Sequence, residues 1–554
     1  MIKSTLFALM RKVCFFVEKV RIFTYKYMYK PQTLHTMKKL AFMLIALCTF
    51  VGTAAQSVIT RTTVEQGALE GVEENGLGVF KAIPYAKPPV GELRWRPPVK
   101  LEKWEGVYKT DQYAKMPPQQ QGRQTDASRW SEDCLYINVM TPAKSKEEKL
   151  PVMVWIHGGG FITGNYTSPM GTNFAKRGVV FVSIAYRTGA LGFLALPELS
   201  AESERGISGN YGLMDQIMAL EWVKNNIAAF GGDADRITIF GESAGAIAVS
   251  MLCASPLAKG LFHAAISQSG GSFCPVDSVR TNNNGIRDVK GAEAYGVEFM
   301  KRIGASSLKE LREMSPEAWI GDTASTGVGG FWPTVDGYVI TDDQYKLYRS
   351  GHFNDVHLLI GTNSDEGSMF VRPSSVEEYV AEVKRDYGPF ADRMLKAYPA
   401  TTEQETFAAR SDIFRETAFA WPTYTWAELQ GKASRKNIYL YYFDYVPERM
   451  QARSPRGAGH AADLQYVFGT FWGEPSAEDR AVSEMMMRSW VNFATTFNPN
   501  GEGVPEWPEY NAKKATVMHI KAQTALITRP NADKLDLMEE FYKWKRGQYK
   551  NTNR

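Results

Sequence analysis

Short apolar runs rich in Val, Ile and aromatic residues recur along this chain, separated by segments with apolar residues at helical spacing. Such runs are typical of buried strands. We expect strands at 135–140, 151–156, 179–186, 356–360 and 438–445. We expect helices at 211–230, over most of 370–430 and at 484–497. Strands that alternate with helices predict a mostly parallel sheet covered on both faces.

The ends of the pattern differ from its middle. Residues 57–100 alternate in polarity and turn often, which predicts β-hairpins, and 517–528 resembles a final strand or hairpin. The polar segment 115–130 predicts an exposed loop. No linker, repeat or low-complexity tract divides the chain, so we expect one large domain over 56–549 with long insertions.

Residues 236–250 hold the first candidate for chemistry. A strand that ends at Phe240 is followed by Gly-Glu-Ser-Ala-Gly at 241–245, and then by an apolar segment, 246–252, that predicts a buried helix. Strand, tight turn and helix is the context in which G-x-S-x-G places a serine on a strained, exposed turn. The bare pattern is weak in a chain with 47 glycines, because an ordinary glycine-rich turn also matches it.

A nucleophilic serine needs a base, an acid that orients the base, and donors for the oxyanion. In α/β-hydrolases the order along the chain is serine, acid, histidine, so both partners of Ser243 are expected downstream. His460 lies on a glycine-flanked loop after a strand, whereas the other histidines after residue 56 precede the acid or lie in unsuitable segments. Asp365 and Glu366 follow a strand, and composition does not choose between them.

Two further features accompany these candidates. Three consecutive glycines, 158–160, follow the strand 151–156 and predict backbone N–H groups that point into a cavity. Glu242 is a second carboxylate beside the serine. It could tune the site, although the plainer interpretation is a charge that complements the start of the following helix.

These motifs together resemble the type-B carboxylesterases, a family that includes cholinesterases and bacterial p-nitrobenzyl esterases. The resemblance runs from about residue 57 to 545, and its motifs are 82–86, 132–138, 157–161, 186–193, 210–216 and 240–245. It implies an α/β-hydrolase fold, with no metal or organic cofactor. It also implies a nucleophile, a base and an orienting acid, which are Ser243, His460 and Glu366 rather than Asp365. The implied oxyanion donors are the backbone N–H groups of Gly159, Gly160 and Ala244.

The resemblance has structural implications and departures. Arg94 is expected to pair with Glu132 in a salt bridge away from the chemistry. In many relatives the cysteine equivalent to Cys134 is bridged to an upstream cysteine, but this chain has none there. Residues 115–130 lack the aromatic lining that cholinesterases have, so a cationic choline substrate is not expected. The small residues at 326–330 suggest a roomy acyl pocket.

The N-terminus has the three parts of a secretory signal peptide. Met37 is followed by the basic residues Lys38 and Lys39, by an uncharged, mostly apolar run at 40–51, and then by small residues. We therefore expect a signal peptide at 37–55 and export to the periplasm or medium. Residues 1–36 lie upstream of a plausible start at Met37 and are interpreted as a non-native extension or a leader. The apolar run is too short for a permanent membrane span, so stable membrane insertion is not expected.

Composition narrows the picture. The chain has 554 residues, 44% of them apolar, which is enough for a large core. Residues 1–55 carry nine Lys/Arg and one Glu, and removing that +8 from the net charge of +4 leaves −4. Nothing in that balance indicates a nucleic-acid partner. Cys134, Cys253 and Cys274 follow residue 56; Cys253 and Cys274 could form a disulfide, or all three could be buried thiols.

The sequence therefore predicts an exported serine carboxylic ester hydrolase that needs no cofactor or metal. Its substrate is expected to be a small-molecule ester or an ester linked to a polysaccharide. Two alternatives remain. One is a non-catalytic, cholinesterase-like binding protein on the same fold. The other is an amidase or thioesterase, because the same three residues serve those leaving groups as well.

Overall fold

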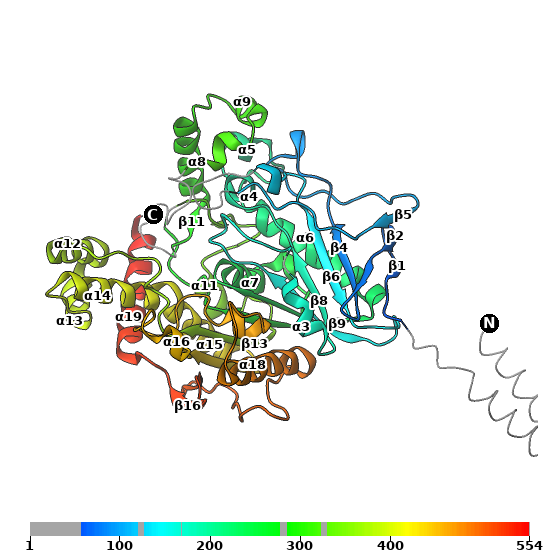
Figure 1. Ribbon diagram of the computed structural model, residues 1–554. Coiled ribbons are helices and arrows are strands. Elements are labelled where there is room, and N and C mark those ends of the chain that lie inside the picture. Colours follow the sequence, from blue (N-terminus) through cyan, green and yellow to red (C-terminus); the bar gives the residue numbers. More distant parts are fainter. Residues whose placement is uncertain (1–56, 120–126, 168, 278–284, 323–329, 553–554) are drawn as a thin grey trace, which may run out of the picture. The chain divides into compact units, whose positions relative to one another are not determined.

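A mixed eleven-stranded sheet organises the part of the chain described by the computed structural model, residues 57–119, 127–167, 169–277, 285–322 and 330–552. From Val58 onward the chain forms one compact unit. The order of the strands across the sheet is β16-β15-β14-β13-β10-β9-β7-β8-β6-β4-β3 (Figure 1). Their bounds are β3 (Val72–Glu74), β4 (Leu77–Pro84), β6 (Tyr136–Thr141), β7 (Leu150–Ile156), β8 (Val180–Ile184), β9 (Gly232–Glu242), β10 (Ala264–Gln268), β13 (His357–Asn363), β14 (Ile438–Phe443), β15 (Thr516–Ile520) and β16 (Ala525–Thr528).

The centre of this sheet is parallel, as predicted. All pairings from β8 across to β15 are parallel, whereas β6, β4 and β3 at one edge and β16 at the other are antiparallel. Two small sheets lie beside it, and their strands are β1 (Arg61–Val64), β2 (Gly67–Glu70), β5 (Val107–Lys109), β11 (Arg287–Asp288) and β12 (Thr334–Val335).

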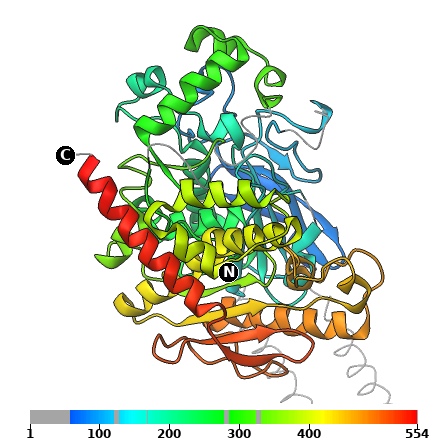
Figure 2. The same ribbon diagram turned by 90° about the vertical axis from the view of Figure 1, so that its left-hand side faces the viewer.

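Helices cover both faces of the sheet. One layer packs α6 (Tyr211–Asn226), α7 (Ala244–Ala254) and α15 (Trp421–Ala433) on the central strands, and α19 (Ala532–Thr552) lies outside α15 (Figure 2). The other layer holds α3 (Thr172–Ala175), α17 (Leu464–Phe468) and α18 (Ala477–Thr496). The remaining helices are α4 (Gly189–Phe193), α5 (Pro197–Glu202), α8 (Val289–Ile303), α9 (Leu308–Glu313), α10 (Glu317–Ile320), α11 (Gln344–Arg349), α12 (Val376–Tyr387), α13 (Ala391–Ala397), α14 (Glu403–Arg415) and α16 (Glu448–Gln451).

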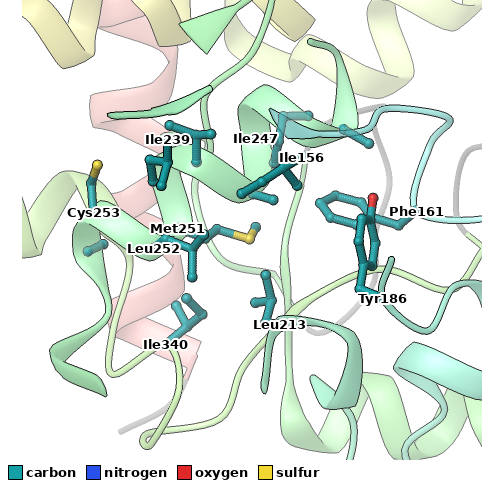
Figure 3. Close-up of a cluster of buried hydrophobic side chains, with 14 of the residues drawn as sticks. Ile156, Phe161, Tyr186, Leu213, Ile239, Ile247, Met251, Leu252, Cys253 and Ile340 are labelled. Carbon is teal, nitrogen blue, oxygen red and sulfur yellow. The ribbon is translucent and has the colours of Figure 1, made fainter. Parts of the chain in front are cut away.

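The two layers explain why the central strands are apolar throughout. Along β7, Val152 and Val154 pack into the cluster under α6 and α7, while Met153 and Trp155 pack into the cluster under α18. Successive side chains of a strand point to opposite faces, so both sets must be apolar when both faces are covered. Figure 3 shows the first cluster, where Ile156 and the α7 side chains meet.

The predicted elements hold with shifted boundaries. Hairpins form only up to Pro84, and 85–100 contains no strand. The predicted helix 211–230 ends as α6 at Asn226 and continues as a 3₁₀ turn. The helix predicted at 484–497 begins at Ala477, because Ser476 and Asp479 form a capping box there. Residues 517–528 are a hairpin of β15 and β16.

The possible disulfide between Cys253 and Cys274 is wrong. Both cysteines are free and buried, and so is Cys134. Cys253 lies in the core on α7, whereas the Cys274 thiol donates to the Thr417 carbonyl at 3.6 Å. The alternative of three buried thiols is the correct one.

Three expectations concern residues that the structure does not describe. The extension 1–36 and the signal peptide 37–55 lie outside the described residues, as does most of the loop 326–330. Among the helices in the described ranges, none is both long and apolar enough to cross a bilayer.

The turn between β9 and α7 requires glycine at two positions. A Cβ atom on Gly241 would lie 2.6 Å from the Gly245 carbonyl carbon and 2.7 Å from the Ile156 oxygen. A Cβ atom on Gly245 would lie 2.1 Å from the same Ile156 oxygen. The obstacle is backbone in each case, so it cannot rotate away as a flexible side chain would. The end of β7, the end of β9 and the start of α7 therefore meet at van der Waals distance.

We expect Gly245→Ala to destabilise the fold by about 1–3 kcal/mol, the usual cost of forcing an extra carbon into a packed site. The measurement is the thermal unfolding midpoint by circular dichroism. Gly431→Ala is the matched control, because Gly431 lies within α15 and its nearest neighbour, Ile438 Cδ1, would be 3.7 Å away. That variant should keep or slightly raise the midpoint. Equal midpoints for the two variants would contradict the packing argument.

Candidate active site

Ser243 occupies the turn between β9 and α7 in a backbone conformation that residues other than glycine rarely adopt. Its φ is 57° and its ψ is −125°. Its backbone N–H donates to the Gln268 carbonyl at 2.9 Å, and its own carbonyl accepts from Ile247 N at 2.9 Å, the first hydrogen bond of the helix. The residue is held from both sides, and its side chain remains half-buried and open to a cavity.

His460 and Glu366 reach Ser243 from the loops that follow β14 and β13. His460 Nε2 lies 2.9 Å from Ser243 Oγ, and His460 Nδ1 lies 2.5 Å from Glu366 Oε2. The other carboxylate oxygen of Glu366 accepts from the Asn363 backbone N–H at 2.7 Å. Glu366 is fully buried, so its carboxylate is fixed in position by these two partners. Three residues that are far apart in the sequence form one continuous hydrogen-bonded chain.

The structure distinguishes the two neighbouring acids. Asp365 faces away from the histidine: its carboxylate accepts from Ser368 Oγ at 2.7 Å and lies 3.5 Å from Arg456 Nε. The backbone explains this difference, because the Asp365 N–H donates to the Ala458 carbonyl at 2.8 Å and joins the two loops in a β-bridge. Successive side chains then point to opposite sides, and Glu366 is the one that faces His460.

The glycine loop lines the same cavity. Gly159 and Gly160 have φ angles of 106° and 64°, which favour glycine. The Gly159 carbonyl points back into its own turn, where it accepts from Ile162 N at 3.1 Å and Thr163 N at 3.0 Å. Ala244 is the first residue of α7, beside the serine. Within the described residues, the N–H groups of Gly159, Gly160 and Ala244 donate to no protein acceptor.

Comparisons with known proteins identify the family of this chain. The family model described as "Carboxylesterase family" matches residues 57–538. The chain belongs to the carboxylesterase family. It is 35% identical over 487 residues to the fumonisin B1 esterase of Sphingopyxis macrogoltabida, covering 83% of this chain and 86% of that one. It is 32% identical over 492 residues to the para-nitrobenzyl esterase of Bacillus subtilis (strain 168), covering 85% and 97%.

Solved structures lead to the same result. A structure titled PNB esterase superimposes with a TM-score of 0.75 at 32% identity, covering 86% of this chain and 99% of that chain. The predicted α/β-hydrolase fold and the predicted family are therefore confirmed. The chain is a carboxylic ester hydrolase.

Two buried interactions support the glycine loop of this esterase. Tyr186 donates through its hydroxyl to the His157 carbonyl at 2.8 Å and stacks on the His157 ring, with 4.3 Å between centroids. Gly189 N donates to the Phe161 carbonyl at 2.7 Å, at the other end of the loop. Arg187 lies between Tyr186 and Gly189 in the sequence. It is fully buried and forms a bidentate pair with Asp215 of α6, at 2.8 and 2.7 Å.

The salt bridge expected from the family resemblance is present. Arg94 Nη2 lies 2.5 Å from Glu132 Oε2, and Arg94 Nε lies 2.6 Å from Glu132 Oε1. The same guanidinium donates to the Arg312 and Met314 carbonyls at 2.8 Å each. It joins three loops of the esterase and does not line the cavity over Ser243.

Carboxyl groups surround His460 and set its protonation. Burial lowers the pKa of His460, but Glu242 and Glu366 outweigh this effect and raise the pKa to about 9. Glu242 Oε1 lies 3.3 Å from His460 Nε2, on the side of the serine. Burial raises the pKa of Glu242 to about 8. Glu242 is therefore close enough to the imidazole for the charge of each group to influence the pKa of the other.

Sequence reasoning missed several neighbours of the histidine. The rings of Phe419 and Phe370 lie 4.6 and 5.0 Å from the imidazole, centroid to centroid. Phe419 is in a π-helical turn, Glu416–Ala420, within the segment predicted only as helical. Asp463, fully buried behind the acid loop, accepts from Gln268 at 2.8 Å. Asp463 could have been suspected from the sequence, because it follows His460 by three residues on the same loop.

The other histidines that the structure describes are not part of the site. His263 and His357 accept backbone N–H groups at the ends of strands, and His519 pairs with Asp444 at 3.0 Å. His352 bonds to Ser350, and His157 holds the glycine loop. Across the described ranges, no three His, Cys, Asp or Glu side chains gather closely enough to hold a metal ion.

Proposed function

We propose that this esterase works through an acyl-enzyme on Ser243, with His460 as general base, Glu366 as orienting acid, and the N–H groups of Gly159, Gly160 and Ala244 as oxyanion donors. One observation carries the proposal: the unbroken hydrogen-bonded chain from Ser243 Oγ to His460 to Glu366, at 2.9 and 2.5 Å. A non-catalytic binding protein has no need for that chain or for a glycine loop with free donors.

The proposed reaction has two halves. Ser243 Oγ attacks the ester carbonyl carbon as its proton passes to His460 Nε2. The carbonyl oxygen gains negative charge, which the three N–H groups stabilise; one such donor is worth about 3 kcal/mol of barrier. The imidazolium then gives its proton to the leaving alcohol. Water, deprotonated by the same nitrogen, attacks the acyl-enzyme. The bond between the acyl carbon and Ser243 Oγ then breaks, the imidazolium returns its proton to Oγ, and the carboxylic acid leaves.

The cavity over Ser243 suggests the kind of ester. It has a volume of about 480 Å³ and is lined on the His460 side by Met369 and Phe370, whose side chains are 56% and 41% exposed. An apolar wall open to solvent favours an ester with an apolar group next to the carbonyl or the leaving oxygen. Small-molecule esters and esters linked to a polysaccharide both meet this condition.

We expect Ser243→Ala and Glu366→Gln to lower kcat for p-nitrophenyl butyrate by about 10⁴-fold or more. The first change removes the nucleophile, and the second removes the carboxylate that holds the imidazole tautomer. The measurement is a steady-state assay with p-nitrophenyl esters from acetate to octanoate, with the matching p-nitroanilides run beside them to distinguish an esterase from an amidase.

Asp365→Asn is the matched control for Glu366→Gln. It changes the adjacent residue in the same way, but its side chain faces Ser368 and Arg456. Its kcat should stay within about tenfold of wild type, which is small beside the loss of a triad member. An Asp365→Asn variant as inactive as Glu366→Gln would overturn the assignment of the acid.

The pH profile should respond to Glu242. The base acts only as neutral imidazole, so kcat/KM should rise with pH through the pKa of His460, which is raised to about 9. Glu242→Gln removes a negative charge that favours the imidazolium, so this pKa falls and the rising limb should move by about one unit to lower pH. Glu313→Gln, at an exposed surface position, serves as control. A limb that stays in place in Glu242→Gln would refute this electrostatic role.

We also propose that the esterase is exported. The basic residues Lys38 and Lys39, the apolar run 40–51 and the small residues that follow support this proposal. The mature N-terminus, read by Edman degradation of protein expressed with its full leader, should be residue 55 or 56. A mature protein that begins upstream of Met37 would rule out this signal peptide.

A further inference from the structure

A second cavity lies away from the serine, between α5, α6 and the proline-rich segment 93–99. Its volume is about 660 Å³, within the range of about 300–1,000 Å³ that is typical of ligand sites. It shares no lining residue with the cavity over Ser243. The mechanism proposed above makes no use of it.

The floor of this cavity is an apolar stripe on α6. Met214, Ile217 and Met218 lie at positions i, i+3 and i+4 and therefore share one face of the helix. The neighbouring Leu213 points instead into the core cluster of Figure 3. Met214 and Met218 remain partly exposed. Methionine side chains are flexible and adapt to ligands of different shape, so this floor suits binding better than tight packing would.

The walls are held rigidly. On one side Pro97 and Pro98 restrict the backbone, and Arg187 Nη1 donates to the Arg96 carbonyl at 2.8 Å. Trp95 Nε1 donates to the Ala190 carbonyl at 2.9 Å. On the opposite side, Tyr338 supplies an aromatic wall. The cavity is formed in advance, so a ligand would not have to order these groups.

Some charged side chains at the rim are held in ion pairs with described residues, and Arg205 is not. The Arg205 guanidinium lies over the Tyr338 ring, 3.9 Å from its centroid, and forms no ion pair with any described residue. Glu202 is already paired with Arg312, at 2.7 and 2.8 Å. Arg96 is shared between Glu92 at 4.0 Å and Glu202 at 3.7 Å. Glu204 and Glu221 complete the set of charged groups that line this cavity.

We propose that this cavity binds a small amphipathic monocarboxylate. Its apolar or aromatic body would lie on Met214 and Met218, and its carboxylate would accept from Arg205, whose planar fork matches a carboxylate in two hydrogen bonds. Stacking on Tyr338 holds that fork in place before the ligand arrives. Glu204 and Glu221 add negative charge nearby, so a ligand with several carboxylates is disfavoured.

Isothermal titration calorimetry of the full chain with 2-naphthoate tests the proposal, because this probe carries no ester. We expect Arg205→Gln to weaken 2-naphthoate binding about tenfold, the effect of losing one charge-assisted pair. The uncharged 2-naphthamide should bind wild type and Arg205→Gln equally. Met218→Trp, which fills the cavity, should abolish the binding of both compounds.

Two controls keep the test decisive. Arg385→Gln removes an exposed arginine paired with Asp386, outside the cavity, and should leave binding unchanged. Hydrolysis of p-nitrophenyl butyrate checks that each variant is folded. Absence of 2-naphthoate binding to wild type would overturn the proposal. So would equal binding to wild type, Arg205→Gln and Met218→Trp, which would place the probe elsewhere, and so would a 2-naphthamide affinity that falls with Arg205→Gln.

Discussion

The backbone of Ser243 is held at a positive φ angle between a strand and a helix, and the candidate site depends on it. A non-glycine residue at φ 57° is unfavourable by itself, so the surroundings must enforce it. Close packing and a backbone hydrogen bond together hold Ser243 in this conformation. The glycines at 241 and 245 let α7 close on the end of β7, and the Ser243 N–H is bound by the Gln268 carbonyl of the adjacent strand.

The parallel sheet then brings the other groups to this point. β9, β10, β13 and β14 are consecutive neighbours with the same direction, so their carboxyl ends meet at one edge. The loops after β9, β13 and β14 carry the serine, the acid and the histidine, while β10 supplies the carbonyl that fixes the serine. The β-bridge between Asp365 and Gly459 joins the acid loop to the histidine loop, so the distance between their side chains is set by backbone pairing rather than by flexible connections.

How far the sequence could predict this arrangement depends on the range of each interaction. The strands, the serine turn and the glycine loop follow from local patterns, since each needs only a few adjacent residues. The choice between Asp365 and Glu366 does not, because it depends on which neighbour faces a loop nearly a hundred residues away; the family resemblance supplied the answer, and the β-bridge gives its physical reason. The sequence also did not predict the π-helical turn that brings Phe419 against His460, because the residues of this turn fit the pattern of an ordinary α-helix. The predicted disulfide between Cys253 and Cys274 was wrong for a similar reason. The presence of two cysteines in the sequence does not show whether their side chains meet in the folded core.

The buried thiols have a consequence for how this fold responds to reducing agents. Among the described cysteines no covalent cross-link exists, and burial raises the pKa of all three thiols, so few thiolates are present to react with oxidants. The two apolar clusters that enclose the sheet stabilise the fold, and their packing does not depend on the redox potential of the surroundings. A reducing agent such as dithiothreitol therefore has no cross-link to break among the described residues.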